Sequence, residues 1–413
     1  MENIGILISN EKWGGSFQYA LSIIDSLIKY SHKYNYKIIT NNSENLNRSV
    51  FAIPRNIDYI FLSNKKSSLK NKIKLACNLA IRNNFFNVQN NEIISQIKNH
   101  QVKLLITPFA SLMCYKNKIP YIVSILDIMH KYYPSFPEYP LKERIMRNIV
   151  YENASKHSLF AVVDSKQGED DLNSFYKIPK EKIRVIPYIP PPYIYKYKNM
   201  TIDTASNILA KYSLPNKFLF YPAQFWYHKN HIRLFKALKL INEKNQEKIY
   251  LVLVGSPKES FANIMNFIKK NNLSHQIIYL GYVSDKEIVA LYKKAVAFVF
   301  PSLLGPTNIP PLEAMLLGTP VICSKLFSMP DQIGNAGLFF NPFEVKDIAD
   351  KIYKIWMDKD LRSNLIRKGY KKIKDITLER YAKQWEDVID EALEIVKWII
   401  IFKHLLFLNN YFN

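Results

Sequence analysis

The sequence predicts an α/β protein built from two doubly wound, Rossmann-like domains that face a central cleft. Three observations support this prediction: short apolar runs alternate with helical patterns, the alternation restarts in the second half, and a proline-rich segment separates the halves. Near-continuous apolar runs are typical of parallel strands that helices cover on both faces. With 413 residues, the chain has room for two large domains at about 150 residues each. Ligands of such folds bind beyond the carboxyl ends of the strands, so we expect the site in that cleft.

The first half opens with an apolar run at residues 4–8, which predicts a buried strand. The pair Gly14 and Gly15 follows, and apolar residues then recur at helical spacing as far as Leu27. This pattern predicts a strand, a glycine loop and a helix. Five further runs predict strands of the same sheet: residues 36–39, 59–62, 104–106, 121–125 and 159–163.

The second half repeats this alternation, with predicted helices at residues 231–241 and 285–295. Its predicted strands are residues 218–221, 250–254, 277–280, 297–300 and 320–322. Four prolines between residues 187 and 192 cannot continue a helix or a central strand, so we expect a linker near 187–200. The predicted domains are therefore 1–190 and 200–385. A last helix or tail, 386–413, packs back on the first domain or against a membrane.

The charge is unusually positive: 57 Lys and Arg against 35 Asp and Glu give +22. Such an excess favours an anionic partner, either nucleic acid, an anionic membrane surface or a phosphorylated substrate. A compositional bias toward Lys, Asn, Ile and Tyr explains it equally well. No zinc spacing, helix-turn-helix or RNA-binding aromatic motif is present, so we expect no nucleic-acid partner.

The three cysteines are far apart in the sequence and show no C-x-x-C spacing, which argues against disulfides and zinc. We find no signal-peptide pattern and no uninterrupted apolar run of about 18 residues. We therefore expect a cytoplasmic protein.

Two segments suggest contact with a membrane surface. Residues 59–91 contain six basic residues and no Asp or Glu, and apolar residues recur at helical spacing between Leu69 and Ala80. A basic amphipathic helix binds anionic surfaces, although a solvated lysine face on a surface helix gives the same pattern. The apolar tail at 398–408, interrupted by Lys403 and His404, is either an interfacial anchor or a last helix packed on the body.

The most informative segment is residues 301–320, a Pro/Gly loop that leads into the sequence Leu-Glu-Ala-Met. Backbone N–H groups of such a loop at a helix start can bind an anion. We expect Glu313 in the first turn of that helix, where a carboxylate is favoured by the dipole and can also accept sugar hydroxyls. The residues alone do not separate these two roles.

This segment resembles the donor-binding signature of retaining glycosyltransferases of the GT-B fold. The family is glycosyltransferase family 4, or group 1, which includes sucrose synthase, glycogen synthase and many bacterial surface mannosyltransferases. Glu313 matches the family's second Glu, which binds the nucleotide ribose. The family's first Glu falls at Gly305, so the resemblance implies that Thr307, Asn308 and Ile309 hold the donor sugar instead.

The resemblance extends over most of the chain. Lys229 matches the family's phosphate-binding Lys, whereas the family's Arg falls at Gln224, which we still place at the donor. Gly14 and Gly15 resemble the first glycine loop, which lies against the donor phosphates.

Residues 120–130 resemble the family's strand that ends in His-Asp. Leu126 stands at the His, Asp127 matches the Asp, and His130 resembles a His that some members carry just beyond it. Ser165, after a later strand, is a further candidate for the cleft.

The resemblance implies a metal-independent hexosyltransferase with Lys229, Glu313, His130 and Asp127 as its catalytic candidates. It implies transfer, with retention, from a nucleotide-diphosphate sugar to a glycan or lipid-linked acceptor. The pathway would be bacterial lipopolysaccharide or capsule synthesis at the inner face of the membrane, with no cofactor beyond the donor substrate. Because Gly305, Gln224 and Leu126 depart from the pattern, a weakened GT-B protein that binds nucleotide sugar or glycan without efficient transfer is the alternative.

Overall fold

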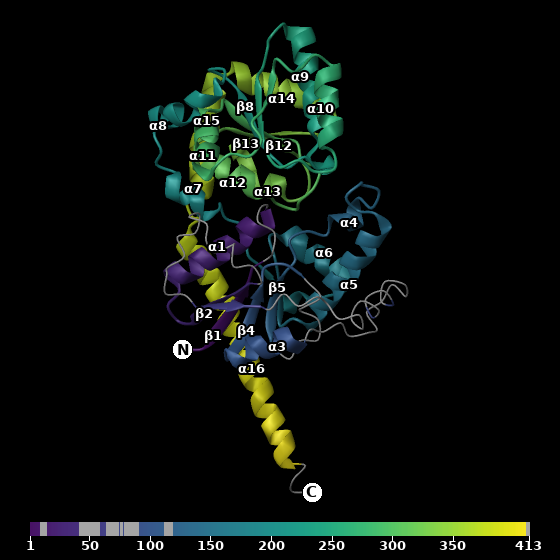
Figure 1. The fold of residues 1–413 in the computed structure, drawn as a ribbon, viewed down its shortest axis with the longest axis vertical. Coiled ribbons are helices and arrows are strands. Elements are labelled where there is room, and N and C mark those ends of the chain that lie inside the picture. The colour runs from purple at the N-terminus through teal and green to yellow at the C-terminus, as the bar shows by residue number, and fades with distance from the viewer. Residues whose placement is uncertain are drawn as a thin grey trace. The chain divides into compact units, whose positions relative to one another are not determined.

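The computed structural model describes residues 1–8, 15–40, 58–62, 74, 77, 91–110 and 119–409, and divides into two compact units (Figure 1). The first unit comprises Met1–Pro134, Tyr139–Pro187 and Thr377–Asn413. The second comprises Ser135–Glu138 and Tyr188–Ile376. The basic segment between residues 65 and 82 lies outside the described residues, apart from Lys74 and Cys77.

The described strands of the first unit form one parallel sheet in the order β3-β2-β1-β4-β5-β6-β7. They are β1 (Asn3–Leu7), β2 (Asn35–Thr40), β3 (Asp58–Phe61), β4 (Val102–Thr107), β5 (Tyr121–Ser124), β6 (Phe160–Val163) and β7 (Ile183–Val185). The inner strands are buried along their whole length, as in β5 and β6, because helices cover both faces of a parallel sheet. The predicted doubly wound fold is confirmed for this unit.

The helices of this unit alternate with its strands. They are α1 (Gly15–Tyr30), α3 (Asn91–Asn99), α4 (Met129–Tyr132), α5 (Leu141–His157), α6 (Lys166–Tyr176) and α16 (Leu378–Asn409). Helix α1 buries an almost continuous apolar stripe from Phe17 to Leu27, which matches the helical spacing in the sequence.

Helix α16, the last helix of the chain, packs back on α1 of the first unit. Trp385 and Ile389 are fully buried in this contact, and the Glu386 carboxylate accepts a hydrogen bond from Ser31. Beyond Leu393 the helix loses its cover, and Trp398 is 71% exposed. Within the described chain, no helix is long and apolar enough to cross a membrane.

The second unit contains another parallel sheet, in the order β10-β9-β8-β11-β12-β13. Its strands are β8 (Leu219–Pro222), β9 (Leu251–Val254), β10 (Ile277–Tyr279), β11 (Ala297–Phe300), β12 (Val321–Ser324) and β13 (Gly337–Phe340). The order reverses between β8 and β11, so a crevice is expected beyond their carboxyl ends.

The helices of the second unit are α7 (Pro192–Tyr197), α8 (Ile202–Leu209), α9 (His231–Asn245), α10 (Phe261–Lys270), α11 (Asp285–Lys294), α12 (Ile309–Leu316), α13 (Met329–Ile333), α14 (Val345–Met357) and α15 (Lys359–Ile373). Local sequence explains several of their starts. Ser284 and Glu287 form a capping box at α11, and Asp358 caps α15.

The proline-rich segment is only partly a linker, because α7 forms within the predicted range 187–200. Pro192 occupies the first turn of this helix, where a missing N–H costs nothing and the fixed φ suits the helix. Prolines just ahead of a helix therefore mark its start and do not prevent it.

Candidate functional site

Lys229 lies where the carboxyl ends of β8 and β11 meet. It ends the 3₁₀ turn Tyr227–Lys229, and its carbonyl accepts a hydrogen bond from the Tyr221 hydroxyl at 2.7 Å. Its Nζ lies 3.5 Å from Ser302 Oγ and 5.2 Å from the ring centroid of Phe300, the last residue of β11. The ammonium group is thus fixed at the crevice end of the sheet, where it can attract an anion.

The loop that carries Lys229 is tied to the loop that follows β11. The Leu303 N–H donates to the carbonyl of His228 at 2.8 Å. The side-chain amide of Asn230 donates to the carbonyls of Pro301 (3.1 Å) and Pro342 (2.9 Å). Asn230 itself adopts the left-handed conformation, with φ of 59°, which lets α9 start immediately after the turn. These bonds hold the two loops as one platform.

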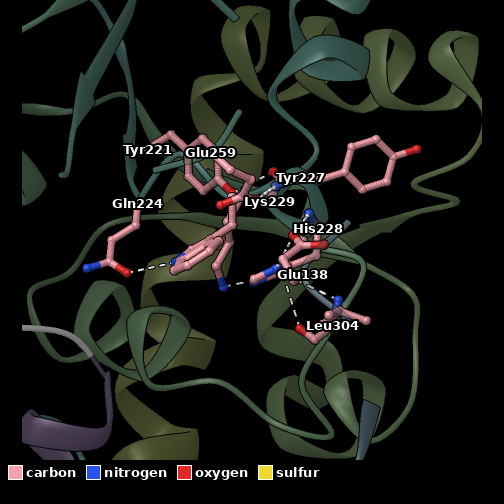
Figure 2. A network of polar contacts seen from close by, with 10 residues as sticks. Glu138, Tyr221, Gln224, Tyr227, His228, Lys229, Glu259 and Leu304 are labelled. Carbon is pink, nitrogen blue, oxygen red and sulfur yellow. Dashed lines mark hydrogen bonds and ion pairs between the residues drawn. The ribbon is translucent and has the colours of Figure 1, made fainter. Parts of the chain in front are cut away.

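His228 is anchored by a carboxylate from a distant part of the chain, as Figure 2 shows. One oxygen of Glu138 lies 2.8 Å from the His228 backbone nitrogen, which donates to it, and 2.9 Å from the ring Nδ1. Burial by itself would raise the pKa of Glu138, but the hydrogen bonds from His228 outweigh it and hold that pKa below its usual range. Sequence reasoning missed Glu138, because nothing local marks a residue that pairs across 90 positions.

Gln224, which stands at the family's Arg, makes a local contact. Its carbonyl oxygen accepts a hydrogen bond from the Trp226 indole at 2.9 Å, and its amide nitrogen points away from that ring (Figure 2). Lys258 lies 5.1 Å from the centroid of the Trp226 ring. A cation is therefore present beside this loop, although Gln224 supplies none.

Gly305 is not simply a position that has lost a carboxylate. Its φ is +103°, a conformation that L-residues rarely adopt. An added Cβ would lie 2.7 Å from the side-chain nitrogen of Asn308. The loop is therefore built around a glycine, and Asn308 packs where a side chain would otherwise begin.

In the loop at the start of α12, where backbone N–H groups were expected to bind an anion, one donor is already engaged. The Asn308 N–H donates to Gln332 Oε1 at 3.0 Å, and Gln332 Nε2 donates back to the Asn308 carbonyl at 2.9 Å. The next positions after Ile309 are Pro310 and Pro311, which have no N–H. Thr307 is largely buried, and Ile309 is partly exposed at the helix start. This helix start thus offers fewer free donors than the sequence suggested.

Glu313 lies in the second turn of α12, not in the first turn as predicted. The helix begins four residues earlier, at Ile309, because prolines are favourable in its first turn. Glu313 is 6% exposed, so the helix dipole does not explain its position.

Two tyrosine hydroxyls contact the Glu313 carboxyl group. Tyr292 donates to Oε2 at 2.8 Å and Tyr193 to Oε1 at 3.3 Å. Burial raises the pKa of Glu313 to about 7, although both hydrogen bonds act in the opposite direction. The group is a buried carboxyl that changes charge near neutral pH and has already bound two hydroxyls. Sequence reasoning identified Glu313 but missed both tyrosines.

In the first unit, Asp127 follows the carboxyl end of β5. Its Oδ1 accepts a hydrogen bond from the Met129 N–H at 3.2 Å and lies 3.8 Å from an Arg147 nitrogen. Its side chain is 36% exposed. Asp127 is therefore a positioned carboxylate that solvent or a ligand can reach.

His130 is deeply buried, at 2% exposure. Its Nε2 lies 3.0 Å from Asn148 Oδ1 and 3.0 Å from the Tyr176 hydroxyl, whereas Nδ1 has no hydrogen-bond partner among the described residues. Burial, with smaller contributions from Arg147 and Lys131, lowers the pKa of His130 to about 4, although Asn148 and Asp127 act in the opposite direction. The imidazole is neutral at pH 7.

Three further candidates in this unit are Gly14, Gly15 and Ser165. Gly14 lies outside the described residues, and Gly15 is the first residue of α1, with open space where a Cβ would stand. Ser165 caps α6: its Oγ accepts from the Gly168 N–H at 3.1 Å and donates to Asp164. Ser165 therefore has a structural role that the sequence did not indicate.

No group of three or more His, Cys, Asp or Glu side chains suited to a metal ion occurs in the described part of the chain. An Asp-x-Asp spacing is present at Asp358 and Asp360, but Asp358 Oδ1 accepts a hydrogen bond from the Leu361 N–H at 2.8 Å as the cap of α15.

Comparison with known proteins places this architecture in a family. Residues 203–372, all within the second unit, match the family model of glycosyl transferases group 1. We call the second unit the group 1 unit after this match. The group 1 unit contains Gln224, Lys229, the 305–309 loop and Glu313, while Asp127 and His130 lie in the other unit.

Two curated relatives and one solved structure extend the comparison. The serotype-specific mannosyltransferase WbdA of Escherichia coli is 32% identical over 195 residues, 46% of this chain and 23% of WbdA. The O-antigen chain mannosyltransferase B of Escherichia coli is 27% identical over 257 residues, 60% of this chain and 65% of that protein. The chain thus spans less than two thirds of either relative.

The Anabaena protein HepE, solved in complex with UDP and glucose, superimposes with a TM-score of 0.72 at 15% identity. The match covers 95% of this chain and 100% of HepE. Together with the parallel sheet in each unit, this similarity confirms the predicted GT-B fold.

Proposed function

We propose that the protein transfers a sugar from a nucleotide-diphosphate sugar to a glycan or lipid-linked acceptor in the synthesis of a cell-surface polysaccharide. The observation that carries this proposal is the position of Lys229 in the group 1 unit, with its Nζ beside Ser302 at the end of β11. The names of WbdA and of the O-antigen chain mannosyltransferase B support a mannosyl donor and a polysaccharide product. The complex of HepE with UDP and glucose supports a nucleotide-diphosphate donor.

The main chemical demand is to stabilise the negative charge that develops on the leaving diphosphate. Lys229 supplies a preorganised positive charge at the sheet end, where such a charge is worth more than in water. In the proposed retaining reaction, the bond from the anomeric carbon to the diphosphate oxygen breaks and the acceptor oxygen bonds on the same face. The acceptor's proton passes to an oxygen of the leaving phosphate. The proposal needs no divalent ion.

We propose that Glu313 binds the ribose of the donor. A carboxylate can accept hydrogen bonds from two vicinal hydroxyls, and the contacts from two tyrosine hydroxyls to Oε1 and Oε2 support this proposal. The longer contact, from Tyr193 at 3.3 Å, is the one that a ribose hydroxyl would replace. Thr307, Asn308 and Ile309 remain our candidates for the donor sugar, and Gln224, Gly14 and Gly15 for the phosphate side.

On the acceptor side we propose Asp127 as the residue that orients the acceptor hydroxyl, because Arg147 and the Met129 N–H fix a partly exposed carboxylate. His130 has a weaker claim to direct chemistry, since its ring is buried.

A screen of nucleotide sugars by thermal shift and turnover tests the proposed function. A donor that binds the folded protein raises its melting temperature, by an amount that grows with ligand concentration. We expect a shift and acceptor-dependent release of the nucleotide with a mannosyl donor first. The absence of both a shift and turnover across all common nucleotide sugars would contradict the proposal.

The alternative is a GT-B protein that binds nucleotide sugar or glycan without efficient transfer. The specific observations that favour it are the glycine-dependent loop at Gly305 and the engagement of Gln224 with Trp226. Calorimetric binding of a donor, combined with no turnover over a broad acceptor panel, would select this alternative.

We also propose that the protein attaches peripherally to an anionic membrane at the cytoplasmic face. Large apolar side chains from Trp398 to Phe402 are 42–71% exposed on consecutive positions of α16, next to Lys397. An apolar helix end flanked by lysines inserts into a lipid interface.

Co-sedimentation with phosphatidylglycerol vesicles tests this attachment. Replacing Trp398 and Phe402 by Ser should release the protein, whereas Ser at the equally exposed Met357 should not. Equal binding by both variants would contradict the attachment through α16.

A further inference from the structure

A cavity in the first unit has no role in the function proposed so far. It has a volume of about 310 Å³ and lies between α4 and the first half of α5. Its lining combines basic and amide side chains with apolar ones: His130, Lys131, Arg144 and Asn148, with Pro134, Leu141 and Ile145. Of these residues, the sequence analysis identified only His130 as a candidate.

Two cations line this cavity without a close ion pair to any described carboxylate, and the carboxylate charge that acts on Lys131 is that of Glu152. Neither Lys131 nor Arg144 forms an ion pair with any described residue, and the Nε of Arg144 is buried without a hydrogen-bond partner in the described chain. The Lys131 Nζ lies 4.8 Å from the Tyr176 ring centroid, and burial lowers its pKa. By contrast, Arg147 on the same helix pairs with Glu143 at 2.9 Å. Unpaired cations that are partly desolvated favour the binding of an anion.

The buried imidazole adds a third polar group to the cavity. His130 is held by Asn148 and Tyr176 through Nε2, which leaves Nδ1 without a partner among the described residues. A buried polar atom in this state is costly unless something binds it. An anion in the cavity would favour the protonated ring, whose Nδ1–H would then donate to it.

We propose that this cavity binds a phosphoryl group through Arg144, Lys131 and His130. Two cations match the charge of a phosphate dianion, and the guanidinium fork suits two of its oxygens. If the protein is a glycosyltransferase, the phosphoryl group belongs to the acceptor; this assignment rests on the proposed function, whereas the binding itself does not. A phosphate on the acceptor would also explain part of the positive charge of the chain.

Calorimetric titration with inorganic phosphate tests the binding. The titration uses the Lys229→Ala protein, so that the donor loop does not contribute. We expect one site, at least ten-fold weaker in Arg144→Gln and in Lys131→Gln. Lys142→Gln, at an exposed position of the same helix, is the matched control and should bind as its parent does. Equal affinity in the cavity variants and the control, or no binding at all, would overturn the proposal.

The ring of His130 provides an independent readout. In spectra of histidine-labelled protein, the signal that disappears in His130→Gln should titrate at higher pH when phosphate is present. A His130 signal that phosphate does not move, with phosphate binding elsewhere, would also overturn the proposal.

A further experiment tests whether the bound phosphoryl group belongs to a sugar acceptor or to a lipid headgroup. Glycerol 3-phosphate should bind at least as well as inorganic phosphate, and Arg144→Gln should raise KM for a phosphorylated acceptor ten-fold without changing KM for the donor. If Arg144-dependent binding is seen only with phosphatidate vesicles, the group is a lipid headgroup and the acceptor assignment fails. Phosphate binding without any sugar transfer would leave the cavity site standing and contradict only the proposed function.

Discussion

The two units present their charged side chains in opposite ways. In the group 1 unit, His228 donates hydrogen bonds to Glu138, Glu313 accepts them from two tyrosines, and Lys229 contacts Ser302. In the first unit, Lys131 and Arg144 line a cavity without an ion pair to any described residue.

The two units also differ in their buried histidines, His130 in the first unit and His231 in the second. The ring of His231 stacks on Phe225, with the centroids 4.8 Å apart, and both of its nitrogens are buried without described partners. His130 lines the cavity between α4 and α5, and His231 is not among the residues that line that cavity. An unsatisfied nitrogen therefore indicates a ligand only where the structure also leaves room for that ligand.

The largest effect should come from Lys229, which tests whether the group 1 unit is the donor side. Lys229→Ala should lower transfer by about 100-fold or more, because a charge aimed at the leaving group is lost. Lys236→Ala, at an exposed position on α9, is the control and should leave steady-state rates unchanged. Wild-type activity in the Lys229 variant would show that the group 1 unit is not the donor side.

The carboxyl group of Glu313 should make the stability of the group 1 unit depend on pH. Its pKa is raised to about 7, so the folded state holds its proton more tightly than the unfolded state does. The contribution of Glu313 to the free energy of unfolding should therefore fall as pH rises from about 4.5 through 7, by an amount on the order of 2 kcal/mol. Chemical denaturation at several pH values should show this slope in the difference between the unfolding free energies of wild type and Glu313→Gln.

Donor binding should show the opposite trend, because only the carboxylate accepts both ribose hydroxyls. Donor affinity should rise with pH through about 7 in wild type and stay flat in Glu313→Gln. A slope that is identical in the two proteins would show that another group titrates.

Restoring the family's carboxylate at residue 305 should not restore a family-like donor site. Gly305→Glu places an L-residue at φ of +103° against Asn308, so it should destabilise the protein by about 1–3 kcal/mol. Its melting temperature can be compared with that of Gly15→Ala, where no atom lies within 4 Å of the new Cβ. Faster transfer by Gly305→Glu would show that the loop readily accepts a carboxylate.

The smallest effect should come from His231. His231→Phe removes two unpartnered nitrogens from an aromatic core and should stabilise the protein by about 1 kcal/mol at pH 7. Because burial lowers the pKa of His231 to about 3, the contribution of this residue to stability should fall as pH drops below about 6.5, so the advantage of the variant over wild type should be larger at pH 5 than at pH 7. Urea denaturation at pH 5 and 7 measures both. Destabilisation at both pH values would show that the ring nitrogens have partners outside the described contacts.

The strands were predictable because their apolar runs are local. Residues 297–300, for example, form β11 at the predicted position. Lys229 and Glu313 were marked by short motifs in the same way. The turn that carries Glu313 was predicted wrongly, since the two prolines ahead of it start the helix earlier than expected.

The partners of the site residues could not be predicted. Glu138 meets His228 across 90 positions and Tyr193 meets Glu313 across 120, and neither pair leaves a local signal. The sequence left open whether the last helix packs on the first domain or against a membrane, and the structure shows that α16 packs on α1.

By itself, the sequence determined the two parallel sheets, the group 1 signature and the positions of its basic and acidic residues. Hydrophobic periodicity and the chemistry of glycine and proline act over a few residues, and these features depend on nothing else. Only the tertiary structure decided which charges are paired and which face a cavity, because the neighbours of Arg144 and Glu313 come from elements that the topology brings together. It also showed that Gly305 is required by its own backbone conformation.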